Sequence, residues 1–248
     1  MTYEEALSYI HGTIRKGAAP GLDRIRELME RLGNPQEQLS YVHITGTNGK
    51  GSTAAMTASV LRSAGYRVGL YTSPFLWRFN ERINVDGRDI EDEALAQVTA
   101  LVKPAAQALS DPPTEFELVT AIALTWFARE HCDIVVLEVG MGGRNDATNE
   151  IPAPEAAVLC NIGLDHTAQL GSTLQAIAEN KSGILKPGCR GVLYPNTAAV
   201  EAVVTGVCRE RGIPLQIADF SKIQVKCSDL TGQILDYKQY SDLHLPLL

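Results

Sequence analysis

The sequence predicts an α/β fold with a mostly parallel sheet and helices on both of its faces. Apolar runs of strand length alternate along the chain with segments of helical character, which is typical of such folds. Residues 134–137 are apolar without a break, as in a strand that is buried on both faces. A glycine-rich turn joins a β-rich run to a helix and a further strand, which predicts a parallel pair with a right-handed crossover.

The individual elements follow from periodicity and punctuation. The residues 17–21 separate the first two helices, Gly65 closes the third, and Asp86-Gly87 forms the turn of a small hairpin at 83–90. The predicted helices are residues 4–16, 22–32, 52–64, 91–109, 115–130, 173–180 and 198–211. The predicted strands are residues 41–45, 67–71, 134–137, 156–162, 191–194 and 214–217.

The texture of the chain changes after Phe220. Short alternating runs at 223–225, 231–237 and 243–245, with a turn at Thr231-Gly232, indicate a β-hairpin appendage. We therefore predict two parts, an α/β domain over residues 1–220 and a hairpin extension over residues 221–248. The chain ends on an apolar tail, residues 243–248.

Composition excludes several classes of function. The 248 residues carry a formal charge of −7 and form no basic patch, so we expect no nucleic-acid partner. Five scattered cysteines give neither a zinc spacing nor a disulfide framework, which favours a cytoplasmic protein. No apolar run approaches the ~20 residues that span a bilayer, and the N-terminus has no signal-peptide pattern, so we expect no membrane partner.

A phosphate-binding loop is predicted at residues 46–52, with the sequence Gly-Thr-Asn-Gly-Lys-Gly-Ser. Glycines let successive N–H groups face an anion, and the helix that follows adds its positive N-terminal dipole. Lys50 can reach the β- and γ-phosphates of a nucleotide, and Ser52 can face Mg²⁺. The alternative is an ordinary β-α turn, which the Lys-Gly-Ser at the helix start disfavours. The predicted fold is therefore of the P-loop type, with the nucleotide held by the residues Thr47, Asn48, Gly49, Lys50, Gly51 and Ser52.

Residues 43–53 resemble the P-loop of the Mur ligase superfamily, and most of all its folylpolyglutamate synthase and dihydrofolate synthase branch. The turn at residues 33–36 is also similar to that branch. Members of the branch phosphorylate a carboxylate with ATP and let an amine displace the phosphate. The resemblance runs nearly end to end, and it implies a further C-terminal Rossmann-like domain beyond Leu248. We therefore expect this chain to be incomplete and, alone, poorly active or inactive.

The resemblance also implies a Mg²⁺ site. The segment 71–83 is similar to a loop next to ATP whose serine binds the metal, and Ser73 is the match, although Phe75 stands where the family usually has histidine. Glu138 ends an apolar strand, where doubly wound folds bind ligands, and its carboxylate suits Mg²⁺. His166 follows a strand in a Leu-Asp-His turn that is a metal ligand in the family. The predicted metal ligands are Ser52, Ser73, Glu138 and His166. The alternatives are a turn-forming Ser73, a surface Glu138 and a structural His166.

Lys181 and a substrate pocket complete the prediction. Lys181 matches a lysine that is carbamylated in the family, although Asn180 and Ser182 depart from the usual Glu and Ala. A phosphate-facing or surface ammonium is the alternative. The run 138–149 resembles the family signature in which Asn145, Asp146 and Ala147 line the pterin side of the pocket, and Phe116 either contacts the pterin or packs in the core.

These residues lead to one predicted reaction. An ATP-dependent ligase would join a folate or dihydropteroate carboxylate to L-glutamate, with the catalytic residues Lys50, Glu138, His166 and Lys181. The cofactors would be ATP and Mg²⁺, and the protein would act as a monomer. A peptidoglycan-type Mur ligase and a nucleotide-binding module without catalysis are the alternatives.

Overall fold

The computed structural model describes residues 1–14 and 21–246. They divide into two compact units, Met1–Gln216 and Ile217–Leu248. Within these described ranges, no helix has both the length and the apolar character needed to cross a membrane.

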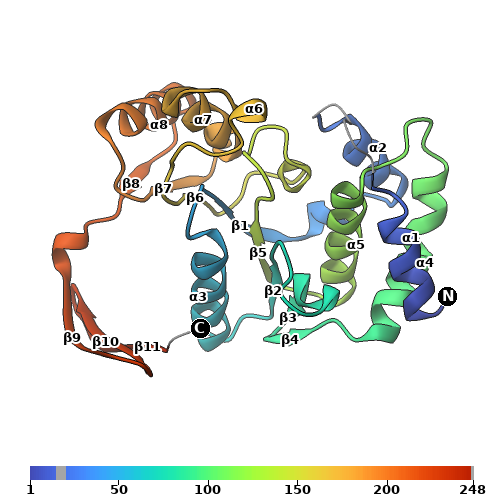
Figure 1. Cartoon of the computed structure of the whole chain (residues 1–248), viewed down its shortest axis with the longest axis horizontal. Coiled ribbons are helices and arrows are strands. Elements are labelled where there is room, and N and C mark those ends of the chain that lie inside the picture. Colours follow the sequence, from blue (N-terminus) through green and yellow to red (C-terminus); the bar gives the residue numbers. More distant parts are fainter. Residues whose placement is uncertain (15–20, 247–248) are drawn as a thin grey trace. The chain divides into compact units, whose positions relative to one another are not determined.

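The main sheet has eight strands in the order β4-β3-β2-β5-β1-β6-β7-β8 (Figure 1). Their bounds are β1 Ser40–Thr45, β2 Val68–Tyr71, β3 Ile83–Val85, β4 Arg88–Asp89, β5 Ile134–Glu138, β6 Ala156–Leu159, β7 Arg190–Leu193 and β8 Leu215–Ile217. The pairs β2–β5, β5–β1, β1–β6 and β6–β7 are parallel, whereas the β3–β4 hairpin adds to β2 in antiparallel register. The expected mostly parallel sheet is confirmed.

Helices follow the strands in the alternation that the sequence indicates. Their bounds are α1 Tyr3–His11, α2 Asp23–Arg31, α3 Lys50–Ser63, α4 Asp92–Gln107, α5 Glu115–Arg129, α6 Thr167–Leu170, α7 Leu174–Lys181 and α8 Ala198–Arg211. Short 3₁₀ turns are η1 Pro35–Gln38, η2 Phe79–Arg82, η3 Ala147–Asn149, η4 Ser182–Ile184 and η5 Phe220–Lys222. Capping boxes begin α1 at Thr2 and α5 at Thr114, because each hydroxyl accepts from a backbone N–H and a Glu side chain three residues on returns the bond.

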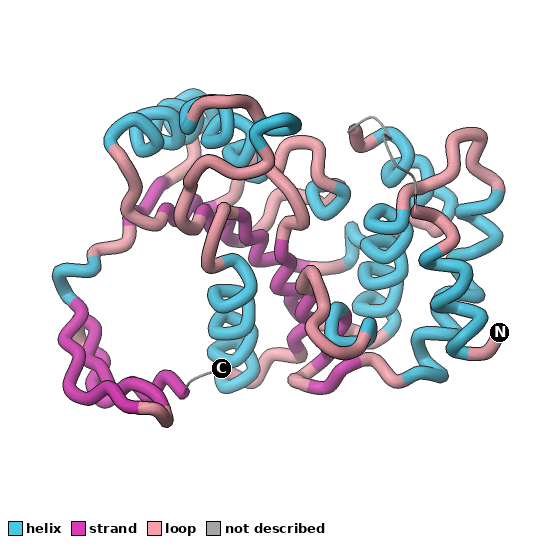
Figure 2. Tube along the Cα trace, viewed as in Figure 1, coloured by secondary structure: helices cyan, strands magenta, loops and turns pink. Residues whose placement is uncertain are grey.

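Both faces of the sheet are covered, as the alternation within β5 shows. Val135 and Leu137 face a core shared with α5, α4 and α2, while Val136 faces α3 on the other side. A third cluster lies between β6, β7 and the pair α7 and α8. Figure 2 shows the helices placed on both sides of the strands.

Several boundaries differ from the expectation. The first helix ends at His11, where Gly12 caps it, and residues 15 and 16 of the expected span lie outside the described residues. The third helix begins two residues early, at Lys50. The strand expected at 156–162 ends at Leu159, because the backbone of Cys160 and Asn161 turns to bond the phosphate loop.

The second unit is a three-stranded antiparallel sheet in the order β11-β10-β9. Its strands are β9 Ile223–Asp229, β10 Gly232–Tyr237 and β11 Tyr240–Pro246. The three alternating runs expected in the appendage form these strands, and Tyr240–Pro246 pairs with β10 as the third of them. Residues 247 and 248 of the apolar tail lie outside the described residues.

Candidate functional site

The phosphate loop lies between the end of β1 and the start of α3. Lys50 is the first residue of α3, and Gly49 before it adopts a left-handed conformation at φ 82°, which favours glycine. Gly46 is in close contact with its neighbours, since a Cβ there would lie 2.6 Å from the Cβ of Cys160. Thr47, Gly51 and Lys50 are half-buried, whereas Asn48, Gly49 and Ser52 are exposed. The loop therefore presents backbone and a cation at a helix N-terminus, as an anion site requires.

The loop is fixed by the segment that follows β6. Thr47 donates its N–H to the carbonyl of Asn161 at 2.7 Å, and its hydroxyl lies 3.1 Å from both the N–H and the carbonyl of Gly163. Asn48 and Asn161 form an isolated bridge. This anchoring holds the loop backbone in one conformation before any ligand binds, which lowers the entropic cost of binding.

Glu138 ends β5 next to the phosphate loop. Its carboxylate is 4% exposed and lies 3.6 Å from the point where a side chain on Gly51 would begin. Oε2 accepts the N–H of Ser73 at 3.2 Å. Burial raises the pKa of Glu138, while that hydrogen bond and the Lys50 ammonium lower it. The surface interpretation of Glu138 is therefore wrong, and the residue is a buried carboxylate at the helix N-terminus.

The other proposed metal ligands are placed less tightly. Ser73 is half-buried beside Glu138, but the His166 side chain is 51% exposed, and its nearest charged partner is the Asp165 carboxylate at 3.7 Å. Among residues 1–14 and 21–246, no hydrogen bond or ion pair joins His166 to Glu138, and no three His, Cys, Asp or Glu side chains form a metal cluster. The Mg²⁺ set thus stays a prediction that combines two serines with Glu138 and His166.

Lys181 is buried beneath the phosphate loop. Its side chain is 3% exposed, and Nζ donates to the carbonyl of Gly46 at 2.8 Å. The surface alternative for this lysine is therefore wrong. Burial, reinforced by the nearby Lys50 ammonium, lowers the pKa of Lys181 to about 8. Two ammonium groups thus repel each other at the loop, which an anion between them would relieve.

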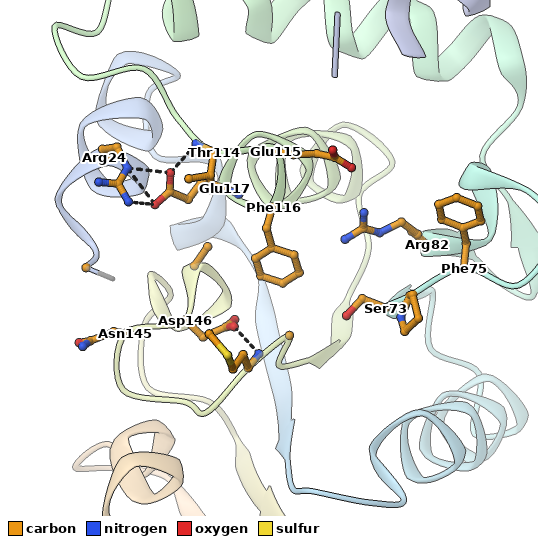
Figure 3. A pocket seen from close by; sticks show the side chains of 15 residues that line it. Arg24, Ser73, Phe75, Arg82, Thr114, Glu115, Phe116, Glu117, Asn145 and Asp146 are labelled. Carbon is orange, nitrogen blue, oxygen red and sulfur yellow. Dashed lines mark hydrogen bonds and ion pairs between the residues drawn. The ribbon is translucent and has the colours of Figure 1, made fainter. Parts of the chain in front are cut away.

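A cavity of about 600 Å³ is lined by Ser73, the residue whose N–H binds Glu138 (Figure 3). Its lining unites the predicted residues Ser73, Phe116, Asn145, Asp146 and Ala147, which come from three separate segments of the chain. The Asp146 carboxylate is buried, whereas Asn145 is exposed at the rim. The loop after β2, the start of α5 and the loop after β5 thus meet at one site.

Phe116 combines core packing with a place in the cavity lining. The ring is half-buried, packs on the main core and lines the cavity. A Cβ on Gly140 would lie 2.5 Å from the Phe116 Cζ, so glycine is required there for the ring to reach the cavity. Core packing and a ligand contact are therefore compatible at this position.

Arg82 is the main feature that the sequence analysis missed. The residue is 7% exposed and lines the cavity, and its guanidinium lies 5.6 to 5.8 Å from the ring centroids of Tyr71, Phe79 and Phe116. Nη2 donates to the Tyr71 hydroxyl at 3.3 Å, but Nε has no hydrogen-bond partner in the described part of the chain. An arginine in the segment 71–83 was visible in the sequence, yet its burial depends on three aromatic side chains from different elements.

Comparison with known proteins places the chain in a family. The model of the Mur ligase middle domain matches residues 44–191, a range that includes the phosphate loop, Glu138 and Lys181. A folylpolyglutamate synthase of Lacticaseibacillus casei is 42% identical over all of this chain and 60% of its own length. A dihydrofolate synthase/folylpolyglutamate synthase of Bacillus subtilis is 46% identical over 75% of this chain and 44% of its own length.

Solved structures agree in fold. An FPGS–AMPPCP–folate complex superimposes on the whole chain with a TM-score of 0.92 at 40% identity, and the match covers 62% of that structure. E. coli FolC in complex with DHPP and ADP gives 0.83 at 32% identity over the whole chain and 58% of its own length. The chain spans 44% to 60% of the two curated relatives named above. The resemblance to the folylpolyglutamate and dihydrofolate synthases is confirmed, and the chain belongs to the Mur ligase family through its middle domain.

Proposed function

We propose that this chain is the ATP-binding, carboxylate-activating part of a ligase that joins a folate-type or dihydropteroate carboxylate to L-glutamate. The proposal rests on one observation: the buried Glu138 carboxylate lies against Gly51 of the phosphate loop and accepts the N–H of Ser73, which lines the cavity together with Phe116 and Asp146. The AMPPCP, folate, DHPP and ADP named in the related structures support the same ligands.

The phosphate loop would bind the triphosphate of ATP. The N–H groups of residues 48–52 and the α3 dipole favour an anion, and Lys50 and Lys181 supply two cations. Since these two ammonium groups repel each other, a triphosphate between them gains electrostatic energy. The loop would therefore position the γ-phosphate toward the cavity.

Mg²⁺ fits the donors on this side of the site. Glu138 is a buried carboxylate whose Oε2 accepts one backbone N–H among the described residues, and carboxylate and hydroxyl oxygens are hard ligands suited to Mg²⁺. Glu138, Ser73 and Ser52 would hold the ion, with His166 as a further ligand. When bound, the ion would supply charge neutralisation for the phosphates.

The cavity would bind the substrate whose carboxylate is activated. Phe116 offers a ring face for a pterin, and Arg82 offers a guanidinium without a carboxylate partner in the described residues. We expect Arg82 to bind a carboxylate of the substrate. Arg82→Met should then weaken folate binding about tenfold but leave the affinity for 6-hydroxymethylpterin unchanged. Equal losses for both ligands would contradict this role.

The reaction would proceed in two displacements. A substrate carboxylate oxygen attacks the γ-phosphorus of ATP, and ADP leaves. The amine of L-glutamate then attacks the acyl carbon, the amide bond forms and inorganic phosphate leaves. Lys50, Glu138, His166 and Lys181 would act by positioning and charge stabilisation. We also propose that the protein works as a monomer.

Calorimetric titration of Mg²⁺ and ATP tests the nucleotide site. The wild-type chain should bind ATP only with Mg²⁺, and Lys50→Ala should lose at least tenfold in affinity, because a charge-assisted contact to phosphate is removed. Lys222→Ala, which removes an exposed lysine from the second unit, should bind like the wild type. Wild-type binding that does not depend on Lys50 would refute the phosphate-loop assignment.

A substrate screen separates this function from its alternatives. Binding of folate or dihydropteroate beside ATP supports the proposal, whereas binding of UDP-linked peptides in their place would support a peptidoglycan-type ligase. A nucleotide-binding module would bind ATP alone. Detectable glutamate ligation by the 248-residue chain would refute that last alternative.

A further inference from the structure

A buried chain of hydrogen-bonded polar groups runs from the central strand β1 to the cavity. His43 is fully buried on β1, and its Nε2 lies 2.9 Å from Thr148 Oγ1. Thr148, also fully buried in η3, donates its hydroxyl to Asp146 Oδ1 at 2.5 Å. Its backbone N–H donates to the same oxygen at 3.0 Å. Met141 donates its N–H to Asp146 Oδ2 at 2.8 Å. Thr148 and Met141 therefore hold one carboxylate that lines the cavity, and His43 contacts Thr148 on the side away from it.

When Asp146 is ionised, proton counting sets the direction of these hydrogen bonds. An ionised carboxylate only accepts hydrogen bonds, and a threonine hydroxyl has a single proton to donate. Since that proton goes to Asp146, the Thr148 oxygen must accept from His43, so the imidazole carries its proton on Nε2. His43 Nδ1 has no hydrogen-bond partner among the described residues. Burial and the nearby Lys186 ammonium lower the pKa of His43 to about 3, which keeps the ring neutral.

This chain of hydrogen bonds ends at the loop that forms the cavity wall. Asp146 joins Met141 to Thr148 and so closes the loop between β5 and η3, which also contributes Asn145 and Ala147 to the cavity. Burial raises the pKa of Asp146, while the bonds from Thr148, Met141 and the Gly140 backbone lower it. The titratable groups that interact electrostatically with Asp146 are the Lys181 ammonium from α7 and the neutral Tyr71 hydroxyl from β2.

We propose that His43 and Thr148 are positioning residues for this site. In this relay His43 donates a hydrogen bond to Thr148, and Thr148 donates one to Asp146. The relay thereby favours the ionised Asp146 carboxylate and holds the loop 140–147 in the shape that binds the ligand. The inference rests on the proposed function, in which this cavity binds a folate-type substrate. Neither residue lines the cavity, so both act through Asp146.

The matched variants are Thr148→Val, which has nearly the same shape but no hydroxyl, and Thr148→Ser, which keeps the hydroxyl. A first measurement needs no ligand: the ¹⁵N shifts of the His43 ring and the ¹³C titration of the Asp146 carboxyl. We expect a neutral Nε2–H ring in the wild type. Because Thr148→Val removes a donor that favours the carboxylate, Asp146 should titrate at higher pH there, and near the wild-type pH in Thr148→Ser.

The second measurement is folate affinity against pH by calorimetry on the full chain with Mg²⁺ and ATP. Thr148→Val should bind folate about tenfold more weakly at pH 7. As the pH is lowered, this variant should lose its folate affinity at a higher pH than the wild type does. Thr148→Ser should restore the affinity at pH 7 and the wild-type pH dependence. If Thr148→Val does not fold, the tautomer of the His43 ring in the wild type and the folate affinity of Thr148→Ser remain as tests.

The outcomes separate the two claims. An Nδ1–H ring in the wild type, or identical Asp146 titrations in the wild type and Thr148→Val, would overturn the relay. The expected tautomer and titration shift in a chain that binds no folate would support the relay and overturn the proposed function.

Discussion

At the scale of single residues, the site contains charges that the fold holds away from water. Glu138 is a buried carboxylate with raised pKa, and Lys181 is a buried ammonium with lowered pKa. Each costs folding free energy because a charge in an apolar environment loses its hydration. Such groups cluster at functional sites, where a ligand of opposite charge supplies the missing partner.

Glu138→Gln should stabilise the chain and weaken its Mg²⁺-dependent ATP binding. A carboxylate whose folded-state pKa is raised lowers stability as pH rises through the window above 4.5, and the cost is complete at higher pH. The amide removes that cost. We expect the Tm at pH 8 to rise by about 2–4 °C, the shift that roughly 1 kcal/mol gives in a chain of this size, and the gain to vanish near pH 4.

Scanning calorimetry at pH 4 and pH 8 measures this effect, with ATP titration on the same samples. Glu81→Gln is a contrasting variant for the Tm measurement, because the pKa of Glu81 is lowered, not raised, by backbone N–H bonds. That variant should lose stability at pH 8. A lower Tm in Glu138→Gln would show that the carboxylate stabilises the ligand-free fold.

Lys181→Met should flatten the alkaline part of the stability profile. The pKa of Lys181 is about 8 in the folded chain and 10.5 in the reference state, so between these values the unfolded state binds more protons. Stability from this group therefore rises with pH, by up to about 1.4 kcal/mol per unit. The variant should lose that rise, while Lys186, whose pKa is also lowered to about 8, remains in both proteins.

Urea unfolding between pH 8 and 10 in CO₂-free buffer gives the slope of the free energy of unfolding against pH for the wild type and for Lys181→Met. Lys222→Met, at an exposed position, should keep the wild-type slope. Intact-mass spectra with and without bicarbonate would reveal carbamylation of Lys181, and a gain of 44 Da that Lys181→Met lacks would support it. Equal slopes in the wild type and Lys181→Met would contradict the buried ammonium.

At the scale of elements, close backbone packing joins the loop after β5 to the turn after α7. The Arg144 N–H donates to the Asn180 carbonyl at 3.0 Å, and the Asn149 amide donates to the carbonyls of Arg144 and Gly183. A Cβ on Gly183 would lie 2.4 Å from the Arg144 Cα. The cavity loop and the segment of Lys181 therefore keep their spacing only because Gly183 has no side chain.

Gly183→Ala should destabilise the chain by about 1–3 kcal/mol, since the new methyl group meets backbone that cannot move aside easily. Gly206→Ala is the matched control. Gly206 lies in the exposed part of α8 with nothing near its Cβ position, so alanine there should stabilise by about 0.5–1 kcal/mol. Denaturant unfolding of both variants measures the contrast, and equal stabilities would contradict the packing argument.

At the scale of the whole molecule, the two compact units differ in how much they bury. The main sheet carries helices on both faces, whereas every residue of β9 is exposed in the three-stranded sheet. A chain of residues 1–220 should therefore unfold with a Tm within about 2 °C of the full chain and bind ATP equally well. Calorimetry on both chains tests this and also the predicted boundary near residue 220. A fall of more than about 5 °C would show that the second sheet stabilises the first unit.

The sequence was sufficient for the fold class, for the glycine-rich loop before α3 and for five of the fifteen residues that line the cavity. Periodicity gave the strand–helix alternation, and the glycine pattern with Lys50 gave the start of α3 to within two residues. Arg82 and the relay from His43 escaped, because their significance depends on side chains from other elements, such as the three rings around Arg82. The extent of the second sheet also escaped, since short exposed strands have weak patterns.

What the sequence alone determined is the local chemistry: a P-loop-type α/β chain with a cation at a helix start and a carboxylate at a strand end. Local composition and periodicity suffice for these features because they depend on neighbouring residues. Only the tertiary structure decided that Lys181 is buried under Gly46, that Arg82 faces the cavity, and that His43 reaches Asp146 through Thr148. Burial and hydrogen-bond direction set those properties, and both arise when residues far apart in the chain are brought together.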